Sequence, residues 1–274
     1  MIVVANGRET EIPEGSTLGA LLEALGVPPR YAVVERNGVA LARGTYDEVV
    51  VAEGDRIEIV RAIGGGQGLA TARLYLVTPS VIERGAVAGL VAELAAAGVD
   101  MIQLREKEME AGDLVRAGEP LAAACRAAGI PFIVNDRPDV ALALSADGVH
   151  LGQNDIGIDI ARRILGDALV GRSTHSPTQI ETAVAEDIDY LAAGPVFETP
   201  TKAGREAAGI EVVGHAARRA HLPWFAIGGI DASNLPYVVE AGARRVVVVR
   251  AITEVPDPVG AAARLRSMLD AVPL

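Results

Sequence analysis

From about residue 74 onward, the chain repeats a short apolar run, a polar or glycine-rich tip and an alanine-rich helical stretch. The eight apolar runs predict strands at residues 74–77, 101–104, 132–134, 148–151, 169–171, 190–193, 224–227 and 245–249. Helical patterns follow at residues 87–97, 112–128, 159–165, 178–185, 212–220, 235–241 and 258–269. Such even alternation favours an α/β protein with a (β/α)8 TIM barrel over a doubly wound sheet.

The first 66 residues follow a different pattern. Two pairs of apolar runs flank Asn-Gly dipeptides, at residues 2–5 and 10–12 around Asn6-Gly7, and at residues 32–35 and 39–41 around Asn37-Gly38. Asn-Gly between such runs is a strong hairpin signal. A helix is predicted over residues 18–25 and a last strand over residues 56–60. We therefore expect a small α+β domain at residues 1–66, a linker at 67–72 and the barrel at 73–274.

Composition narrows the class of protein. Half of the residues are hydrophobic and only 3% are aromatic, so the core must be mainly aliphatic. The formal net charge of −11 argues against nonspecific nucleic-acid binding but leaves an anionic small-molecule substrate open. The start lacks the features of a signal peptide, and no apolar run approaches the ~18 residues of a membrane span. We expect a cytoplasmic protein with no membrane partner and with one inert cysteine, Cys125.

Polar tips follow the predicted strands, and parallel α/β folds bind ligands at the carboxyl ends of their strands. The second tip carries Gln103, Arg105 and Lys107 at alternating positions, so the three side chains can point the same way. Two cations and an amide suit a diphosphate, with Arg as a planar fork and Lys as a point charge. A solvated charged loop is the alternative.

Two carboxylates follow neighbouring strands. Asp136 comes after the third predicted strand and Asp155 after the fourth. Carboxylates with an open remaining shell commonly hold Mg²⁺ beside phosphate oxygens. Each residue alone is equally compatible with a helix cap, but together they favour a metal site. Asp147 and His150 lie within or just before the fourth strand and are interpreted as structural.

The later tips suggest a second anion site. Thr199, Pro200, Thr201 and Lys202 follow the sixth predicted strand and can bind one phosphate while the following segment moves as a lid. Gly228-Gly229 and Val249-Arg250 follow strands seven and eight, the usual phosphate position of a barrel. The mouth therefore looks built for two anionic groups and one divalent metal.

These tips resemble the thiamine-phosphate synthase family over residues 72–271. The motifs that carry the resemblance, in family order, lie at residues 74–78, 103–107, 132–137, 147–153, 194–202 and 227–230. The resemblance implies a transferase of thiamine biosynthesis that joins hydroxymethylpyrimidine diphosphate to a thiazole phosphate, releasing diphosphate and thiamine phosphate.

The resemblance also implies residue roles. The pyrimidine diphosphate would be bound by Gln103, Leu104, Arg105, Glu106, Lys107, Asn135, Ser173 and Lys202. Asp136 and Asp155 would hold Mg²⁺. The thiazole phosphate would be bound by Thr199, Pro200, Thr201, Gly229, Val249 and Arg250, although the family pattern suggests a small Ser at position 250. The implied mechanism is dissociative: Arg105, Lys107 and Lys202 act with Mg²⁺ on the departing diphosphate, and Ser173 contributes to the catalytic set.

The N-terminal segment resembles the sulfur carrier protein of thiamine thiazole synthesis, a ubiquitin-like β-grasp fold that ends in Gly-Gly. The matching end of the segment contains Gly64, Gly65 and Gly66. The family acts through a free terminal carboxylate, but here the chain continues, so carrier activity would require cleavage near Gly65 or Gly66. An adenylating enzyme and a thiazole synthase are then the expected partners.

Two other functions are weighed against synthase activity. A sister barrel, thiazole tautomerase, resembles residues 172–176 and 194–199 and would use His175 as acid–base without a metal. Alternatively, the chain is chiefly a sulfur carrier with the barrel as a passenger. The sequence leaves the oligomeric state open, a homodimer included.

Overall fold

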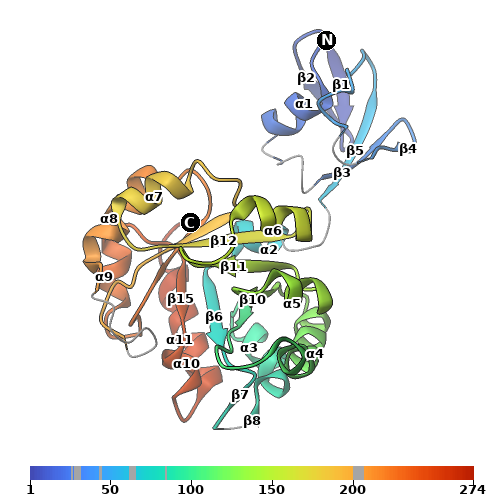
Figure 1. The fold of residues 1–274 in the computed structure, drawn as a ribbon. Helices are drawn as coiled ribbons and strands as arrows, with labels where there is room; N and C mark the ends of the chain where they lie inside the picture. The colour runs from blue at the N-terminus through green and yellow to red at the C-terminus, as the bar shows by residue number, and fades with distance from the viewer. Residues whose placement is uncertain (26, 28–31, 43–44, 62–65, 84, 200–206) are drawn as a thin grey trace. The chain divides into compact units, whose positions relative to one another are not determined.

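The computed structural model describes residues 1–274 except 26, 28–31, 43–44, 62–65, 84 and 200–206 (Figure 1). Residue contacts divide the chain into two compact units, Met1–Gln67 and Gly68–Leu274. Each unit has its own cluster of buried apolar side chains. Among the described residues, no helix is both long enough and apolar enough to cross a membrane.

In its described residues, the first unit is a five-stranded sheet that packs with helix α1. Its elements are β1 (Ile2–Ala5), β2 (Arg8–Glu11), α1 (Leu18–Ala24), β3 (Ala32–Arg36), β4 (Val39–Ala40) and β5 (Arg56–Arg61), and the strand order is β2-β1-β5-β3-β4. Asn6 and Asn37 adopt positive φ angles, as do the glycines that follow them, which confirms both Asn-Gly turns. Thr17 caps α1 by accepting a hydrogen bond from the Ala20 amide at 3.2 Å.

The segment expected to be a linker is largely helical. Helix α2 (Gly66–Thr71) covers most of residues 67–72. Leu69 and Ala72 are buried, and the Arg245 guanidinium donates to the Ala70 carbonyl at 3.0 Å. Burial and this contact hold in place a segment whose glycines alone would favour an irregular chain.

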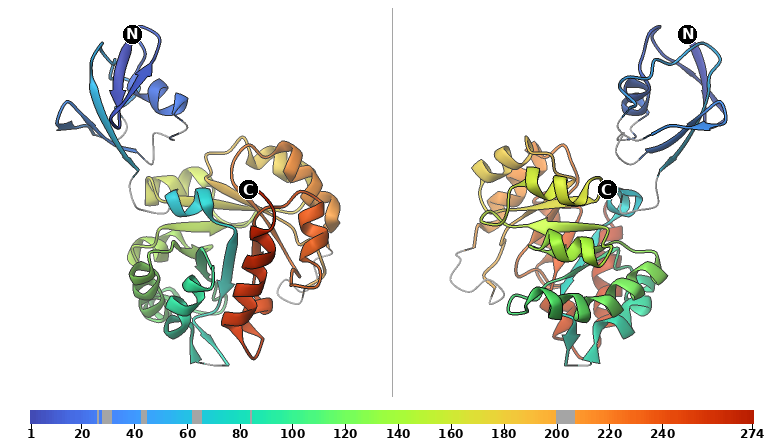
Figure 2. Two further views of the ribbon diagram at one scale, coloured as in Figure 1. Left: turned by 180° about the vertical axis from the view of Figure 1, so that it is seen from behind. Right: turned by 45° about the vertical axis from the view of Figure 1, so that its right-hand side comes forward.

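The second unit is a closed parallel barrel, which confirms the predicted fold (Figure 2). Its strands, in the order in which they pair round the barrel, are β6 (Leu74–Thr78), β9 (Met101–Leu104), β10 (Phe132–Asn135), β11 (Gly148–Leu151), β12 (Leu169–Thr174), β13 (Tyr190–Ala193), β14 (Trp224–Ile227) and β15 (Val246–Val248). Strand β12 runs three residues beyond its predicted end, so Ser173 lies within the strand rather than in a loop.

Helices surround the strands in both views of Figure 2. Among the described residues, these helices are η2 (Val87–Leu90), α3 (Val91–Ala96), α4 (Ala111–Ala128), α5 (Pro138–Ala143), α6 (Ile158–Leu165), α7 (Pro177–Ala183), α8 (Gly209–Arg219), α9 (Leu235–Glu240), α10 (Arg250–Thr253) and α11 (Pro258–Asp270). The two-residue strands β7 (Val81–Ile82) and β8 (Gly85–Ala86) form a hairpin. The short helices α5 and α10, of six and four residues, are absent from the sequence-based prediction. Cys125 is fully buried in α4, and burial together with the Asp147 carboxylate raises the pKa of its thiol to about 12.

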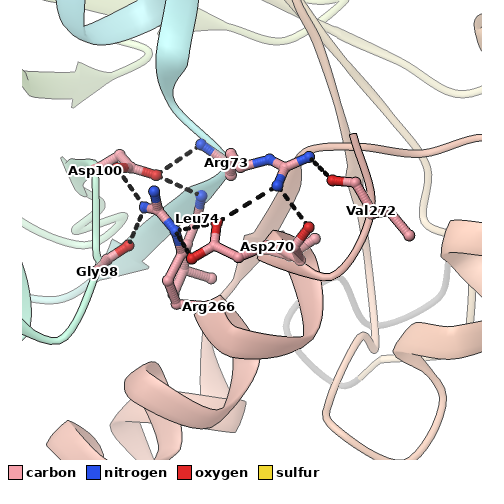
Figure 3. Close-up of polar contacts among 8 residues, drawn as sticks. Arg73, Leu74, Gly98, Asp100, Arg266, Asp270 and Val272 are labelled. Carbon is pink, nitrogen blue, oxygen red and sulfur yellow. Dashed lines mark hydrogen bonds and ion pairs between the residues drawn. The ribbon is translucent and has the colours of Figure 1, made fainter. Parts of the chain in front are cut away.

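Charged side chains close the amino-terminal end of the barrel, opposite the tips (Figure 3). The Asp100 carboxylate accepts hydrogen bonds from the Arg73 and Leu74 amides at 2.7 and 2.9 Å, and it pairs with Arg266 at 2.7 Å. The Arg73 guanidinium donates to the carbonyls of Leu269 and Val272. These contacts join the first strand to the last helix, so the two ends of the repeat are tied together.

Candidate functional site

Side chains alternate between two environments along each barrel strand. Leu74, Leu76, Val149 and Leu151 belong to the apolar layer between strands and helices, whereas Tyr75 and His150 do not. Because successive strand residues point to opposite faces, Tyr75 and His150 lie on the inner face. The rings of Tyr75, Tyr190 and Phe225 meet edge to face there, with centroids 5.4–6.0 Å apart.

A small cavity of about 40 Å³ adjoins this cluster and is lined by Tyr75. Five predicted site residues line it together with apolar side chains: Gln103, Arg105, Asn135, Ser173 and Val249. They come from β9, β10, β12 and the end of β15, so segments up to 146 positions apart in sequence are brought to one place. Tyr75 and His150 also line the cavity, although sequence reasoning assigned neither to the site.

Hydrogen bonds link the polar side chains inside the barrel into one chain. Gln103 Nε2 donates to Tyr75 Oη at 2.6 Å, and Tyr75 Oη lies 3.0 Å from Tyr190 Oη. His150 places Nδ1 3.2 Å from Tyr190 Oη and Nε2 2.9 Å from Ser173 Oγ. Burial raises the pKa of both tyrosines above its ordinary value, so both remain neutral at physiological pH. The interpretation of His150 as purely structural is therefore incomplete, because it contacts a predicted binding residue.

The two predicted metal ligands meet at the barrel mouth. Asp136 and Asp155 are in hydrogen-bond contact, and burial, together with the neighbouring Asp155 carboxylate, raises the pKa of Asp136 to about 6. Asn135 and Arg105 act in the opposite direction on the same group. Asp136 adopts a φ of 62°, and its amide donates to the His150 carbonyl at 2.8 Å. Two neighbouring carboxylates suit a divalent cation such as Mg²⁺, and Asp155 also accepts a hydrogen bond from the Gly152 amide at 2.6 Å.

The two cationic residues of the second tip, Arg105 and Lys107, lie in different environments. Arg105 is half-buried beside Asp136, and burial lowers the pKa of its guanidinium while Asp136 raises it. Lys107 is exposed.

Two residues of this tip depart from the predicted substrate contacts. Leu104 points outward, because it follows Gln103 on the strand, and its side chain packs toward Gly118 of α4. Glu106 is engaged by Ser80, whose amide and hydroxyl donate to its carboxylate at 2.8 and 2.7 Å. The Leu104 side chain therefore belongs to the core, and Glu106 connects two loops.

A second, larger cavity of about 810 Å³ lies at the ends of strands β14 and β15. The predicted phosphate residues Thr199, Gly229, Val249 and Arg250 line it, and Ile227, Val247 and Val249 line both cavities. The two cavities therefore adjoin. Arg250 begins helix α10 and has Glu254 at 3.9 Å, a separation too long for a hydrogen bond.

The Gly228-Gly229 pair is required by packing as well as by position. Both residues have positive φ, at 107° and 65°. A Cβ on Gly229 would lie 2.8 Å from Phe197 Cβ, and one on Gly228 would overlap Pro195. Close packing of the loop after β13 thus accounts for glycine at both positions without any ligand, whereas the sequence-based argument rested on an anion.

Several predicted residues lie outside the described residues: Pro200, Thr201, Lys202, Gly64 and Gly65. Gly66 begins helix α2. His175 is described, and its Nδ1 contacts the Gly194 carbonyl at 2.5 Å while its amide donates to Gln179 at 2.8 Å. His175 lines neither of the two cavities.

Two curated proteins that match most of the barrel unit are thiamine-phosphate synthases. A thiamine-phosphate synthase of Mycobacterium sp. (strain KMS) is 51% identical over 215 residues, covering 74% of this chain and 95% of the relative. A thiamine-phosphate synthase of Thermus thermophilus is 55% identical over 175 residues, covering 64% of this chain and 84% of the relative.

Solved structures agree with the fold. Thiamine phosphate pyrophosphorylase from Pyrococcus furiosus superposes with a TM-score of 0.66 at 31% identity, covering 73% of this chain and 96% of that chain. 3-Hexulose-6-phosphate synthase from Salmonella typhimurium, at 17% identity and a TM-score of 0.54, shares the fold alone; the match covers 73% of this chain and 99% of that chain.

Residues 2–66 match the ThiS family, and residues 74–252 match the family described as thiamine monophosphate synthase. The chain therefore belongs to the thiamine-phosphate synthase family and carries a ThiS-family domain at its N-terminus.

Proposed function

We propose that the barrel mouth binds hydroxymethylpyrimidine diphosphate and a thiazole phosphate side by side and joins them to give thiamine phosphate and diphosphate. The observation that carries this proposal is the pair of adjoining cavities. One is lined by Gln103, Arg105, Asn135 and Ser173, and the other by Thr199, Gly229 and Arg250. A transfer between two substrates requires that both reach one reaction centre, which the shared lining residues allow.

The diphosphate is assigned to the Arg105 side of the site. Arg105 is half-buried beside Asp136, so its charge acts in a partly desolvated environment. Asp136 and Asp155 would hold Mg²⁺, since the two carboxylates are neighbours at the barrel mouth and oxygen ligands of this kind suit that cation. When bound, the cation would supply positive charge for the departing diphosphate oxygens.

The protein's own residues would orient the substrates and stabilise charge. In the reaction, the bond from the pyrimidine methylene carbon to the diphosphate oxygen breaks, and diphosphate leaves with the electron pair. The thiazole nitrogen then supplies the pair for the new C–N bond. Arg105 faces the leaving group, Lys107 and Lys202 are assigned to the same anion, and the apolar residues shared by the cavities keep water from the cationic carbon.

The synthase proposal is tested by supplying both substrates with Mg²⁺ and assaying thiamine phosphate and diphosphate. We expect Asp136→Ala to abolish Mg²⁺-dependent product formation. Asp139→Ala is a matched control, because Asp139 is an exposed carboxylate three positions away that pairs with Arg137. Unchanged turnover in Asp136→Ala would remove the metal assignment, and no product from the wild-type chain would remove the function.

For the N-terminal unit, we propose sulfur-carrier activity that depends on cleavage near Gly65 or Gly66. The ThiS-family match supports it, as does the assignment of Gly68–Leu274 to the barrel unit, because a cut there would leave that unit whole. A free carboxylate at the new terminus would be the acceptor for adenylation and then for sulfur, with an adenylating enzyme and a thiazole synthase as partners.

Intact-mass measurement on protein taken from growing cells tests the carrier proposal. We expect a fragment ending at Gly65 or Gly66, with a mass increase that reports a thiocarboxylate. Detection of only the 28.4 kDa full-length chain would refute it. The thiazole tautomerase alternative is less well supported, because His175 lies outside both cavities and its Nδ1 contacts a backbone carbonyl.

A further inference from the structure

We propose that Tyr75 and Tyr190 are positioning residues that fix the direction of the hydrogen-bond chain inside the barrel, so that the Ser173 hydroxyl donates its proton into the small cavity. The proposal rests on the proposed function for the identity of the ligand. Its geometric part rests on the described residues alone: Gln103, the two tyrosines, His150 and Ser173.

The direction follows from counting protons. Gln103 Nε2 is a donor, so Tyr75 Oη accepts from it at 2.6 Å, and the Tyr75 proton is then directed to Tyr190 Oη. Tyr190 in turn donates to His150 Nδ1. A neutral imidazole has one donor and one acceptor nitrogen. Because Nδ1 accepts, Nε2 carries the proton and donates to Ser173 Oγ at 2.9 Å.

The reverse direction would be costly. If Ser173 donated to His150, the Tyr190 proton would turn toward Tyr75 Oη, which already accepts from Gln103. The Tyr75 proton would then need an acceptor beyond Gln103 and Tyr190, its hydrogen-bond partners among the described residues. Tyr75 is 1% exposed and Tyr190 is 0% exposed, so that acceptor would have to be a water held in the small cavity, which Tyr75 lines and Tyr190 does not.

Gly171 gives independent support for the Tyr190–His150 contact. A Cβ at this position would lie 2.5 Å from both His150 Nδ1 and Tyr190 Oη, and it would overlap the tyrosine ring. Gly171 has no positive φ that would require glycine. The absence of a side chain in the middle of β12 therefore leaves the space in which the two polar atoms meet.

The consequence concerns ligand chemistry. With its oxygen accepting from His150, Ser173 presents a donor to the cavity, so the atom that it recognises must be an acceptor. In the proposed substrate, such an atom is either a diphosphate oxygen or a pyrimidine ring nitrogen. A protonated ring nitrogen or an amino group at the same place would be disfavoured.

Nitrogen-15 NMR of the full-length chain tests the direction without any substrate. The sequence contains four histidines, and the His150 signals can be assigned by substituting His175, His215 and His221 one at a time. We expect His150 to be neutral, with a protonated Nε2 and an unprotonated Nδ1. A protonated Nδ1, in a neutral or a cationic ring, would overturn the proposal whether or not the chain is an active synthase.

Kinetics of two variants test the positioning role. Tyr190→Phe and Tyr75→Phe remove one hydroxyl each and keep the rings, and we expect each to raise KM for the pyrimidine diphosphate about tenfold with a smaller effect on kcat. Tyr46→Phe is the matched control, because Tyr46 is a buried tyrosine of the N-terminal unit whose hydroxyl donates to the Ala32 carbonyl at 2.9 Å. Equal KM values in all three variants would overturn the role.

Inhibition identifies the acceptor. Inorganic diphosphate and hydroxymethylpyrimidine without its diphosphate are each measured against wild type and Ser173→Ala. Weaker inhibition by diphosphate alone supports a phosphate oxygen, and weaker inhibition by the pyrimidine alone supports a ring nitrogen. If Ser173→Ala weakens neither, Ser173 donates to no ligand and the proposal fails.

Discussion

Gly171 shows how a single residue determines whether two polar side chains can meet inside the barrel. The inner face of β12 has to leave room for Tyr190 and His150, and only a residue without Cβ does so. Asp136 shows a second local constraint, because it holds a left-handed φ of 62° although it is not glycine. Such conformations cost about 1–3 kcal/mol and persist where the surroundings enforce them. Here the Asp136 amide is fixed by the His150 carbonyl.

Gly171→Ala should therefore damage the site more than the fold. The added methyl has to displace Tyr190 or His150, which we expect to cost about 1–3 kcal/mol of unfolding free energy. It should also raise KM for the pyrimidine diphosphate about tenfold, the loss expected for one hydrogen bond. Urea unfolding and steady-state kinetics measure the two effects. Gly89→Ala is the control, because nothing lies within 4 Å of its Cβ position; a similar response in both variants would contradict the steric argument.

Three aspartates make the same two hydrogen bonds between neighbouring barrel strands. Asp100, Asp147 and Asp189 each stand directly before a strand, β9, β11 and β13. The amide of each donates to the carbonyl of a residue in the preceding strand, and its carboxylate accepts from the amide of that same residue, at 2.9 Å for Leu74, 2.8 Å for Phe132 and 2.7 Å for Val170. These carboxylates provide hydrogen-bond acceptors for strand amides at the amino-terminal end of the barrel. Before β15 the corresponding residue is Arg245, which instead donates to α2.

Removal of one such carboxylate should destabilise the barrel measurably. Asp147→Ala leaves the Phe132 amide without its acceptor, and we expect a loss of about 1–3 kcal/mol in the free energy of unfolding. Asp147→Asn keeps an oxygen that can accept and should lose less. Chemical denaturation measures both, with exposed Asp113→Ala on α4 as the control. Equal stability of the alanine variant and wild type would show that the contact is dispensable.

For the whole molecule, the important feature is the presence of two separate cores. The N-terminal core contains Leu18, Leu21 and Leu22 of α1, and the barrel core extends from Leu74 to Leu269. The two clusters of described residues share no member, so we expect a defect in one core to leave the packing of the other core intact. The described residues that line the two cavities belong to the second unit.

Leu22→Ala should consequently destabilise one unit and leave synthase turnover unchanged. Leu22 is fully buried, so truncation should cost the N-terminal unit about 2–5 kcal/mol. Calorimetry of the full-length chain should show one of two transitions moving to lower temperature. Leu25→Ala, at a position 39% exposed near the same helix, should change it little. A loss of synthase rate in Leu22→Ala at a temperature where both units are folded would contradict the independence of the units.

Much of this arrangement was predictable because it depends on local periodicity. Alternating apolar runs and helical stretches indicated eight strands, and the Asn-Gly turns indicated both hairpins. The carboxylate pair was predictable because adjacent parallel strands end at the same mouth. Tyr75 and Tyr190 were not, because an aromatic residue in a strand is equally typical of a plain core. The short helices α5 and α10 give no periodic signal.

The sequence by itself determined the family, the barrel, the N-terminal α+β domain and which tips meet at one mouth, since each depends on patterns within short segments. Only the tertiary structure decided that Leu104 points outward into the apolar layer between strands and helices, that Glu106 is engaged by Ser80, and that Gln103 is joined to Ser173 through two tyrosines and a histidine. The physical reason is that side-chain partners are chosen by strand pairing across long sequence separations, such as the 115 positions between Tyr75 and Tyr190.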